Sequence, residues 1–194
     1  MAEKDNYFVH ASDDSLQIVS FKVGEEDYGI PIRDIQRVIR LPNITHLPQT
    51  PDFLRGIINL EGEVVPIIDM HERFEMETEE YNKSTRVIIV RMKDKDVGMI
   101  VDSVSQVQVV AQENIEEVGD FISGISKNYI QGIAKVDEKM IILLKIEKIL
   151  STKEFSIISK ARENNEKKTK QKDKKKNNSK KKGKKKSKKD KKAK

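Results

Sequence analysis

Cysteine is absent from the 194 residues of this sequence, and histidine occurs only three times, as His10, His46 and His71. Without cysteine the chain cannot form a disulfide framework, a thiol nucleophile or a thiolate metal site. The histidines lack the H-x-x-x-H or carboxylate spacing of a metal site, so we expect all three at the surface. We also find no glycine-rich phosphate loop and no nucleophile–base constellation. The sequence therefore predicts no cofactor, no metal ion and no enzymatic activity.

Long apolar segments are also missing. The longest unbroken aliphatic run covers only residues 140–144, whereas a transmembrane helix needs about 20 predominantly apolar residues. The N-terminus is polar and acidic, unlike a secretory signal peptide. We therefore expect a soluble, cytoplasmic protein.

Charges of the two signs are distributed unevenly along the chain, whose overall net charge is +6. Residues 160–194 hold 20 lysine or arginine residues and 4 aspartate or glutamate residues, a net charge of +16. Residues 1–159 hold the other 18 basic and 28 acidic residues, a net charge of −10. The sequence thus predicts an acidic globular part followed by a basic tail.

The lysine-rich tail, residues 160–194, has almost no apolar side chains with which to build a core. Burial could not repay the entropy of ordering this segment, so we expect it to be disordered. Composition leaves four roles open: a solvated tail without specific function, a contact with anionic lipid, a contact with nucleic acid, or a return onto the acidic part of the chain. Because no aromatic residues are interleaved, recognition of single-stranded nucleic acid is disfavoured.

The most informative stretch is residues 53–70, FLRGIINLEGEVVPIIDM. Two runs rich in β-branched residues flank the segment NLEG, whose glycine, Gly62, stands where a tight hairpin turn needs a positive φ. Pro66 predicts an edge or bulged second strand, because proline cannot donate a ladder hydrogen bond. Asp69 ends that strand, and we expect its carboxylate to cap the following turn rather than act as an acid or base.

A second copy of this pattern covers residues 129–146, YIQGIAKVDEKMIILLKI. When the copies are lined up without a gap, Phe53 meets Tyr129 and Gly56 meets Gly132. We expect the two glycines to form structural turns at equivalent positions of two similar subdomains. A repeat of roughly 70 residues is too long for a solenoid and favours two small barrels.

Shorter predicted elements surround the two hairpins. Residues 16–23 and 86–92 are predicted strands, each followed by a turn and a returning strand. A stripe formed by Ile32, Ile35, Val38 and Ile39 predicts a two-turn helix that ends at Pro42. Its periodicity favours packing on its own barrel. Residues 146–159 carry a second helical pattern.

Taken in order, these segments resemble the CheW-like family of bacterial chemotaxis coupling proteins. The resemblance rests on residues 16–23, the Tyr28-Gly29-Ile30 return, the pattern G-x-x-N-L-x-G-x-x-[VI]-P-[IV]-[IV]-D from Gly56 to Asp69, and residues 98–107. It extends over about residues 15–158. It implies a mainly β fold with two SH3-like five-stranded β-barrel subdomains, a short helix in the first, a C-terminal helix and a disordered tail.

The resemblance also implies a division of the chain into a leader, one domain and a tail. We expect a flexible leader at residues 1–15, a CheW-like domain at residues 16–159 and the tail at residues 160–194. Within the domain we expect the first barrel at about residues 16–80, the second at about 85–146 and the C-terminal helix at about 146–159.

The resemblance implies that the protein is a non-enzymatic adaptor in the cytoplasm, like other members of this family. They couple the cytoplasmic tip of chemoreceptors to the regulatory domain of the histidine kinase CheA, in signalling arrays beneath the membrane. The residues that would contact partners are Ile32, Ile35, Arg37, Val38, Ile39, Asn59, Glu61, Gly62 and Val104. The apolar stripe would then also form a groove for a helical hairpin tip. The alternative is a basic-tailed barrel module that binds nucleic acid or anionic lipid.

Arg37 and Glu61 depart from the family pattern, which usually has Glu at the first position and Arg at the second. Their charges are inverted together, and a compensating reversal of this kind suggests two side chains in contact. We therefore predict that they are neighbours across the short helix and the central turn. Such a pair should be partly exposed and should affect partner choice more than stability.

Overall fold

The computed structural model describes residues 15–48, 50–78, 80–92, 95–117, 129–151 and 153–156. The chain divides into two compact units, Met1–Thr152 and Lys153–Lys194, and all described strands lie in the first. The predicted leader, apart from Ser15, and the predicted tail lie outside the described residues.

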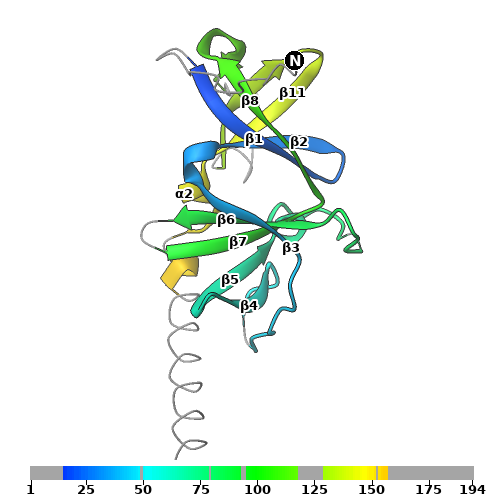
Figure 1. Cartoon of the computed structure of the whole chain (residues 1–194), viewed down its shortest axis with the longest axis vertical. Helices are drawn as coiled ribbons and strands as arrows, with labels where there is room; N and C mark the ends of the chain where they lie inside the picture. Colours follow the sequence, from blue (N-terminus) through cyan, green and yellow to red (C-terminus); the bar gives the residue numbers. More distant parts are fainter. Residues whose placement is uncertain are drawn as a thin grey trace, which may run out of the picture. The chain divides into compact units, whose positions relative to one another are not determined.

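Two β-sheets make up the first unit (Figure 1). The six-stranded sheet has the order β8 (Ser103–Ala111), β1 (Ser15–Val23), β2 (Glu26–Pro31), β11 (Lys139–Leu144), β10 (Ile130–Val136) and β9 (Ile115–Glu116). The five-stranded sheet has the order β3 (Ile35–Arg40), β6 (Arg86–Met92), β7 (Lys95–Val101), β5 (Glu63–Asp69) and β4 (Leu54–Leu60). The predicted mainly β fold class is confirmed.

Each sheet takes strands from both halves of the chain. In the six-stranded sheet, β1 and β2 pair with each other, β1 also pairs with β8, and β2 also pairs with β11. The chain then changes sheet after β2, and β3 pairs with β6 in the five-stranded sheet. It returns to the six-stranded sheet after β7. The predicted division into one barrel at residues 16–80 and another at residues 85–146 is therefore wrong, because hairpins adjacent in sequence do not all share a sheet.

The hairpins β4–β5 and β10–β11 repeat the same pairing, as the sequence duplication predicts. Gly56 lies opposite Ile67 in the first hairpin, and Gly132 lies opposite Leu143 in the second. Each hairpin has a β-bulge immediately before its glycine. Pro66 lies in β5 before the residues that pair with β7, so its missing N–H leaves no gap in that ladder.

The predicted role of Gly56 and Gly132 as turn residues is wrong, because both lie inside strands. A Cβ on Gly56 would lie 2.2 Å from the carbonyl oxygen of Thr45, and a Cβ on Gly132 would lie 2.8 Å from that of Glu116. Thr45, in the chain that continues from β3, bridges to β4, and β9, which follows β8, pairs with β10. The two glycines thus allow the close approach that joins the opposite edges of each sheet.

The predicted two-turn helix around Ile32 and Ile39 is also wrong. Only a single 3-10 turn, η1 (Ile32–Asp34), is present, and the chain then extends into β3. β-branched residues fit a pleated strand well, and pairing with β6 satisfies the backbone hydrogen bonds of this segment. A bulge interrupts this pairing between Ile35 and Arg37.

The helices are short: α1 (Met70–Arg73), α2 (Ile146–Ile149) and the 3-10 turn η2 (Gln112–Asn114). The predicted helix over residues 146–159 is wrong as one element, because Leu150 is extended, with φ −116° and ψ 129°. Residues 153–156 are again helical, and residues 157–159 lie outside the described part of the chain. Ile146, Ile149 and Leu150 are buried, as their spacing predicts.

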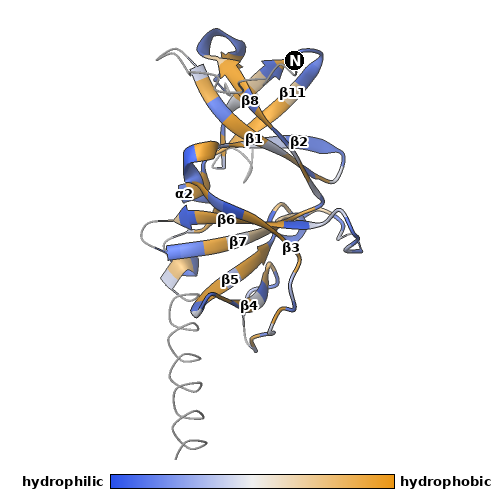
Figure 2. Cartoon of the chain, viewed as in Figure 1, coloured by the Kyte–Doolittle hydropathy of each residue, from blue (hydrophilic) through white to orange (hydrophobic). Residues whose placement is uncertain are grey.

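Alternation of apolar and polar residues along the strands gives each sheet its own core. Figure 2 shows hydrophobic segments along the strands and hydrophilic segments at the turns. The core of the five-stranded sheet contains Ile58, Val65, Ile67, Val87, Ile89 and Ile100. The core of the six-stranded sheet contains Ile18, Val110, Ala134, Ile141 and Leu143. These two cores hold the exposed residues of the candidate site in place.

Candidate functional site

An ion pair between Arg37 and Glu61 joins β3 to the β4–β5 turn. Arg37 Nη1 donates to Glu61 Oε1 at 2.7 Å, and Nη2 donates to Oε2 at 3.1 Å. This forked arrangement matches a guanidinium to a carboxylate. The side chains are 43% and 71% exposed. The predicted neighbourhood of the two residues is confirmed, although Arg37 extends from a strand and not from a helix.

The two partners of this pair shift each other's titration in opposite directions. The hydrogen bond to Glu61, and then its charge, raises the pKa of Arg37. The hydrogen bond from Arg37, and then its charge, lowers the pKa of Glu61. Both groups are therefore ionised at neutral pH. Because solvent surrounds them, they contribute little to stability and remain available to a charged partner.

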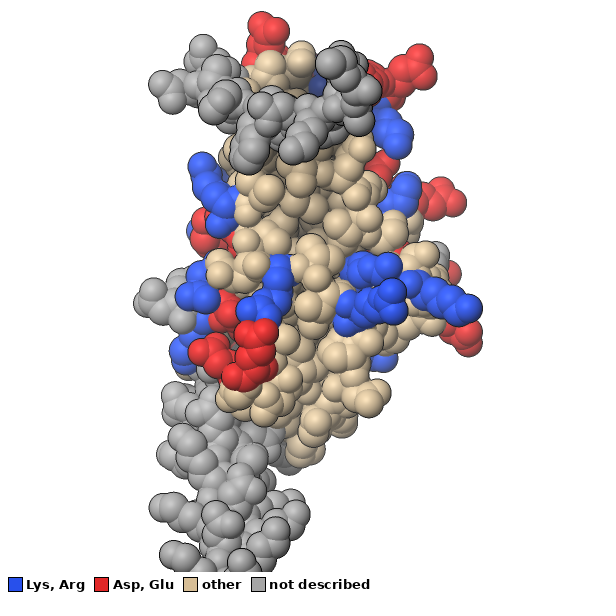
Figure 3. All heavy atoms as spheres, viewed as in Figure 1, with Lys and Arg blue, Asp and Glu red and all other residues tan. Residues whose placement is uncertain are grey.

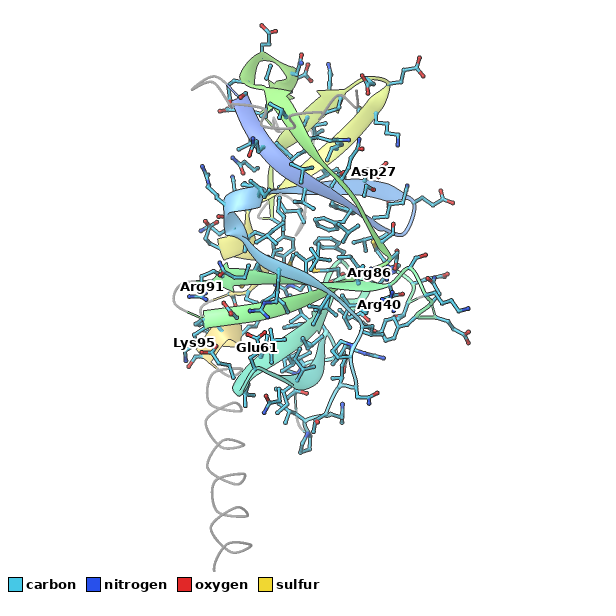
Figure 4. All side chains as sticks on the ribbon, in the orientation of Figure 1. Asp27, Arg40, Glu61, Arg86, Arg91 and Lys95 are labelled. Atoms are coloured by element: carbon cyan, nitrogen blue, oxygen red, sulfur yellow. The ribbon has the colours of Figure 1, made fainter. Side chains whose placement is uncertain are left out.

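The backbone of the β4–β5 turn fixes the position of Glu61. Glu61 has a φ of 54° and Gly62 a φ of 94°, the two positive values of a two-residue type I′ turn. Asn59 Oδ1 accepts a hydrogen bond from the backbone N–H of Gly62 at 2.9 Å. Figure 4 shows Glu61 beside this hairpin. The positive φ that the sequence predicts for Gly62 is thus present.

The predicted apolar contact residues divide between surface and core. Ile32 and Val38 are 38% and 41% exposed. Ile35 is half-buried, and Ile39 packs against the core of the five-stranded sheet. Val104 is half-buried on β8, opposite Phe21 of β1. The structure therefore brings β3 and the central turn together, and it places Val104 in the other sheet.

A buried polar cluster links the two sheets, and no sequence motif predicts it. His71, in α1, is only 5% exposed, so the prediction that it lies at the surface is wrong, whereas His46 is exposed as predicted. His71 Nε2 lies 2.9 Å from Oδ2 of Asp102, and the same oxygen accepts from the backbone N–H of Gly24 at 2.7 Å. Asp102 and His71 are 31 residues apart, so no local motif could reveal this contact.

Acceptors on both sides of the His71 ring favour its protonated form. Nε2 faces the Asp102 carboxylate, and Nδ1 lies 2.8 Å from the backbone carbonyl oxygen of Glu77. Burial acts to lower the pKa of His71, but the hydrogen bonds to Asp102 and Glu77 and the charges of Asp102 and Asp69 outweigh it and raise that pKa. Protonation of His71 thus strengthens the link between the sheets.

The prediction that Asp69 caps a turn is confirmed. Its Oδ1 accepts from the backbone N–H of His71 at 2.9 Å, at the beginning of α1. Its Oδ2 accepts from the Tyr81 hydroxyl at 2.6 Å. Burial, and then the hydrogen bond to Asp69, raises the pKa of Tyr81. Asp69 is fully buried, and these contacts give it a structural role.

An aromatic recess lies beside α1. The rings of Tyr28 and Phe74 stack with centroids 5.2 Å apart, and Tyr129 follows at 6.1 Å from Phe74. These residues line a cavity of about 570 Å³ with apolar residues that include Ile142 and Leu144. Burial, and then the charge of Glu26, raises the pKa of Tyr28 to about 12. The recess therefore offers apolar surface and an unionised phenol.

The described residues contain no group of three or more His, Asp or Glu side chains that could hold a metal ion. Within the same part of the chain, no helix has the length and apolar composition needed to cross a membrane. Figure 3 shows charged side chains of both signs around an uncharged surface on one face.

Comparison with known proteins places this architecture in a family. A family model described as the CheW-like domain matches residues 17–154. The chain is 33% identical over 149 residues to the chemotaxis protein CheW of Klebsiella aerogenes, covering 77% of this chain and 90% of that protein. It is 31% identical to the chemotaxis protein CheW of Treponema pallidum, covering 74% of this chain and 86% of that protein. The crystal structure of the scaffolding protein TtCheW from Thermoanaerobacter tengcongensis matches with a TM-score of 0.67 and 37% identity, covering 72% of this chain and 94% of that one.

Proposed function

The chain belongs to the CheW-like family of chemotaxis scaffold proteins, and from this membership we propose that it is a non-enzymatic adaptor that couples chemoreceptors to the histidine kinase CheA. In this proposal its partners are the cytoplasmic tip of a chemoreceptor and the regulatory domain of the kinase. The protein works in the cytoplasm, held next to the membrane by the receptor arrays that it joins.

We place the partner-binding surface on η1, β3, the end of β4 with the β4–β5 turn, and one residue of β8. It consists of Ile32, Ile35, Arg37, Val38, Ile39, Asn59, Glu61, Gly62 and Val104. The support is that two apolar side chains near the exposed ion pair in the sequence, Ile32 in η1 and Val38 in β3, are themselves exposed. Exposed apolar side chains bordered by charges are typical of protein–protein contact sites.

The single observation that carries this assignment is the Arg37–Glu61 ion pair. Both carboxylate oxygens are engaged, but the pair is too exposed to serve mainly as a stabilising contact. Its position at the tip of a rigid hairpin presents charge to a partner in a fixed orientation. An inverted pair at this position selects partners whose charges are also inverted relative to those of typical family members.

A pull-down with purified kinase regulatory domain tests the proposal. We expect the full chain and a variant that lacks residues 161–194 to retain the kinase domain equally, because the proposed surface lies in the sheets. A matched control is Lys135→Gln, which removes an exposed ion pair with Glu116 on the other sheet and should not affect retention. If the variant without residues 161–194 no longer retains the kinase domain, the proposal is contradicted, and binding through the lysine-rich segment is favoured.

A further inference from the structure

Two arginine side chains of like charge face each other at one end of the five-stranded sheet. Arg40, the last residue of β3, lies directly opposite Arg86, the first residue of β6. Side chains of directly opposed residues point to the same face of a sheet. Figure 4 labels both arginines beside each other there, and Figure 3 shows basic side chains gathered at the same place. We call these two residues the arginine pair.

Backbone carbonyl groups hold the Arg86 side chain in place, and no acidic side chain of the described residues does so. Arg86 Nη1 donates to the carbonyl oxygens of Lys83 at 2.8 Å and Thr85 at 2.9 Å. Among the described residues, no ion pair joins either arginine to a carboxylate, although Arg37 and Arg91 on the same two strands each have one. Like charges directly opposite each other destabilise a sheet. Their cost to the isolated molecule is offset if an anion binds between them.

Apolar surface adjoins the arginine pair. Val38 precedes Arg40 by two residues on the same face of β3 and is 41% exposed. The chain that leaves Arg40 lines a recess of about 540 Å³, to which the apolar Leu41 and Ile44 and the charged Asp52 and Arg55 contribute. A ligand for this region would thus combine negative charge with an apolar side chain.

The occupant that fits best is a short acidic segment of a partner protein. Each guanidinium can bind a carboxylate of the partner through two parallel hydrogen bonds. Val38 can then pack against an apolar side chain that lies between the two carboxylates in the partner segment. Nucleic acid and bilayers draw their affinity from many phosphate contacts, which two arginines do not provide. Residues 1–159 also carry a net charge of −10, which repels an extended polyanion more strongly than a short peptide.

We propose that the arginine pair, with Val38, is a docking site for a partner segment in which glutamate or aspartate residues flank an apolar residue. The site shares Val38 with the surface proposed for the adaptor, but it does not require the adaptor function, because the partner is defined only by its chemistry. It assigns a role to two charged residues that lie outside the expected partner-binding set.

An NMR titration of the full-length, 15N-labelled protein tests this site. The probe is the peptide acetyl-Glu-Glu-Leu-Glu-Glu-amide, and acetyl-Gln-Gln-Leu-Gln-Gln-amide is the uncharged reference. We expect the acidic peptide to shift the amide signals at the end of β3 and the beginning of β6. The combined substitution Arg40→Gln with Arg86→Gln should weaken binding by about tenfold or more, since it removes charge-assisted hydrogen bonds. Site-resolved signals separate this binding from any binding to the lysine-rich tail.

Arg91→Gln is the matched control, because Arg91 lies on the same strand β6 but already pairs with Asp96. It should leave the affinity at β3 and β6 unchanged. Arg40→Gln alone should leave the melting temperature unchanged or raise it, since it removes like-charge repulsion. The proposal is overturned if the amides of β3 and β6 do not shift, or if Arg91→Gln weakens binding as much as the double substitution. Tighter binding of duplex DNA or phosphatidylserine vesicles at the same amides would also overturn it.

Discussion

At the scale of single residues, the Arg37–Glu61 pair gives the sharpest test of partner choice. The double swap Arg37→Glu with Glu61→Arg preserves the forked hydrogen bonds in the opposite orientation, so we expect the fold to be retained. Binding to kinase and receptor partners of typical family members should improve in the double swap, because its charges then match theirs. Each single swap puts like charges together and should bind worse than the double.

Affinities of the four proteins, wild type, two singles and double, form a double-mutant cycle. A large coupling energy is the expected result, since the two groups are in direct contact. Additive effects of the single swaps would mean that the partner reads the two charges separately, which contradicts the idea of a coupled pair.

His71 gives a pH-dependent prediction for stability. Its pKa is raised in the folded protein above its ordinary value of 6.5, so folding favours the protonated ring. The resulting stabilisation is fully present below about pH 6.5 and is lost as the pH rises through the higher folded-state pKa. Urea unfolding at a series of pH values should therefore show a free energy of unfolding that falls across this range.

The substitution Asp102→Asn should reduce this pH dependence, since it removes the charge that faces His71 Nε2. The matched control is His46→Asn: His46 is exposed, so its removal should leave the pH dependence unchanged. If Asp102→Asn leaves the slope as steep as in the wild type, the His71–Asp102 contact is not its source.

At the scale of elements, the bulge in β4 predicts an unusually costly glycine substitution. Gly56 has a φ of 140°, and an added Cβ would lie 2.2 Å from the carbonyl oxygen of Thr45. Gly56→Ala should therefore cost about 3 kcal/mol or more, through backbone strain and loss of the Thr45 bridge. Gly62→Ala, in the same hairpin, meets no atom within 4 Å and should cost only about 1 kcal/mol, from its positive φ. If urea unfolding shows that both variants lose the same free energy of unfolding, the close approach of Thr45 to Gly56 is not the cause of the loss.

Strand β3 explains why one element could not be predicted from the sequence. The bulge between Ile35 and Arg37 shifts the alternation of the strand by one residue. Ile35 and Val38 thereby lie on the same side although they are three residues apart, which imitates the spacing of a helix. The prediction of a helix rested only on the spacing of apolar residues along the sequence. An extra residue at a bulge changes the spacing of residues on one face of a strand, so a bulged strand can have the spacing of a helix. The Arg37–Glu61 contact was predicted all the same, because it was inferred from the joint reversal of two charges relative to the family pattern.

Hairpins were predictable because their signals are local. The β4–β5 turn uses Glu61 and Gly62, and the β10–β11 turn uses Asp137, which also has a positive φ of 54°. Such turns fix the register of the two strands that they join. The contact of His71 with Asp102 was not predictable, because it depends on how α1 meets the connection between β7 and β8.

At the scale of the whole molecule, the duplication did not reveal which strands share a sheet. Both copies cross from one sheet to the other at equivalent points, after β2 and after β7. A repeated sequence is compatible with two separate barrels and with two barrels that exchange strands. The exchange couples the sheets through the chain itself, so we expect the two sheets to unfold together.

The lysine-rich tail leads to the last prediction. Every described strand pairing lies within Met1–Thr152, so the sheets are complete without residues 160–194. Truncation after Ser159 should therefore change the melting temperature by no more than about 2 °C, less than the shift caused by 1 kcal/mol in a domain of this size.

The tail carries a net charge of +16 and the rest of the chain −10, so attraction between them is strongest at low salt. The two proteins should be compared by calorimetry at low and at high salt. A stability loss of several degrees on truncation, larger at low salt, would show that the tail binds the acidic part of the chain. Equal melting at both salt concentrations is the expected result, and it would leave the tail free for an external partner.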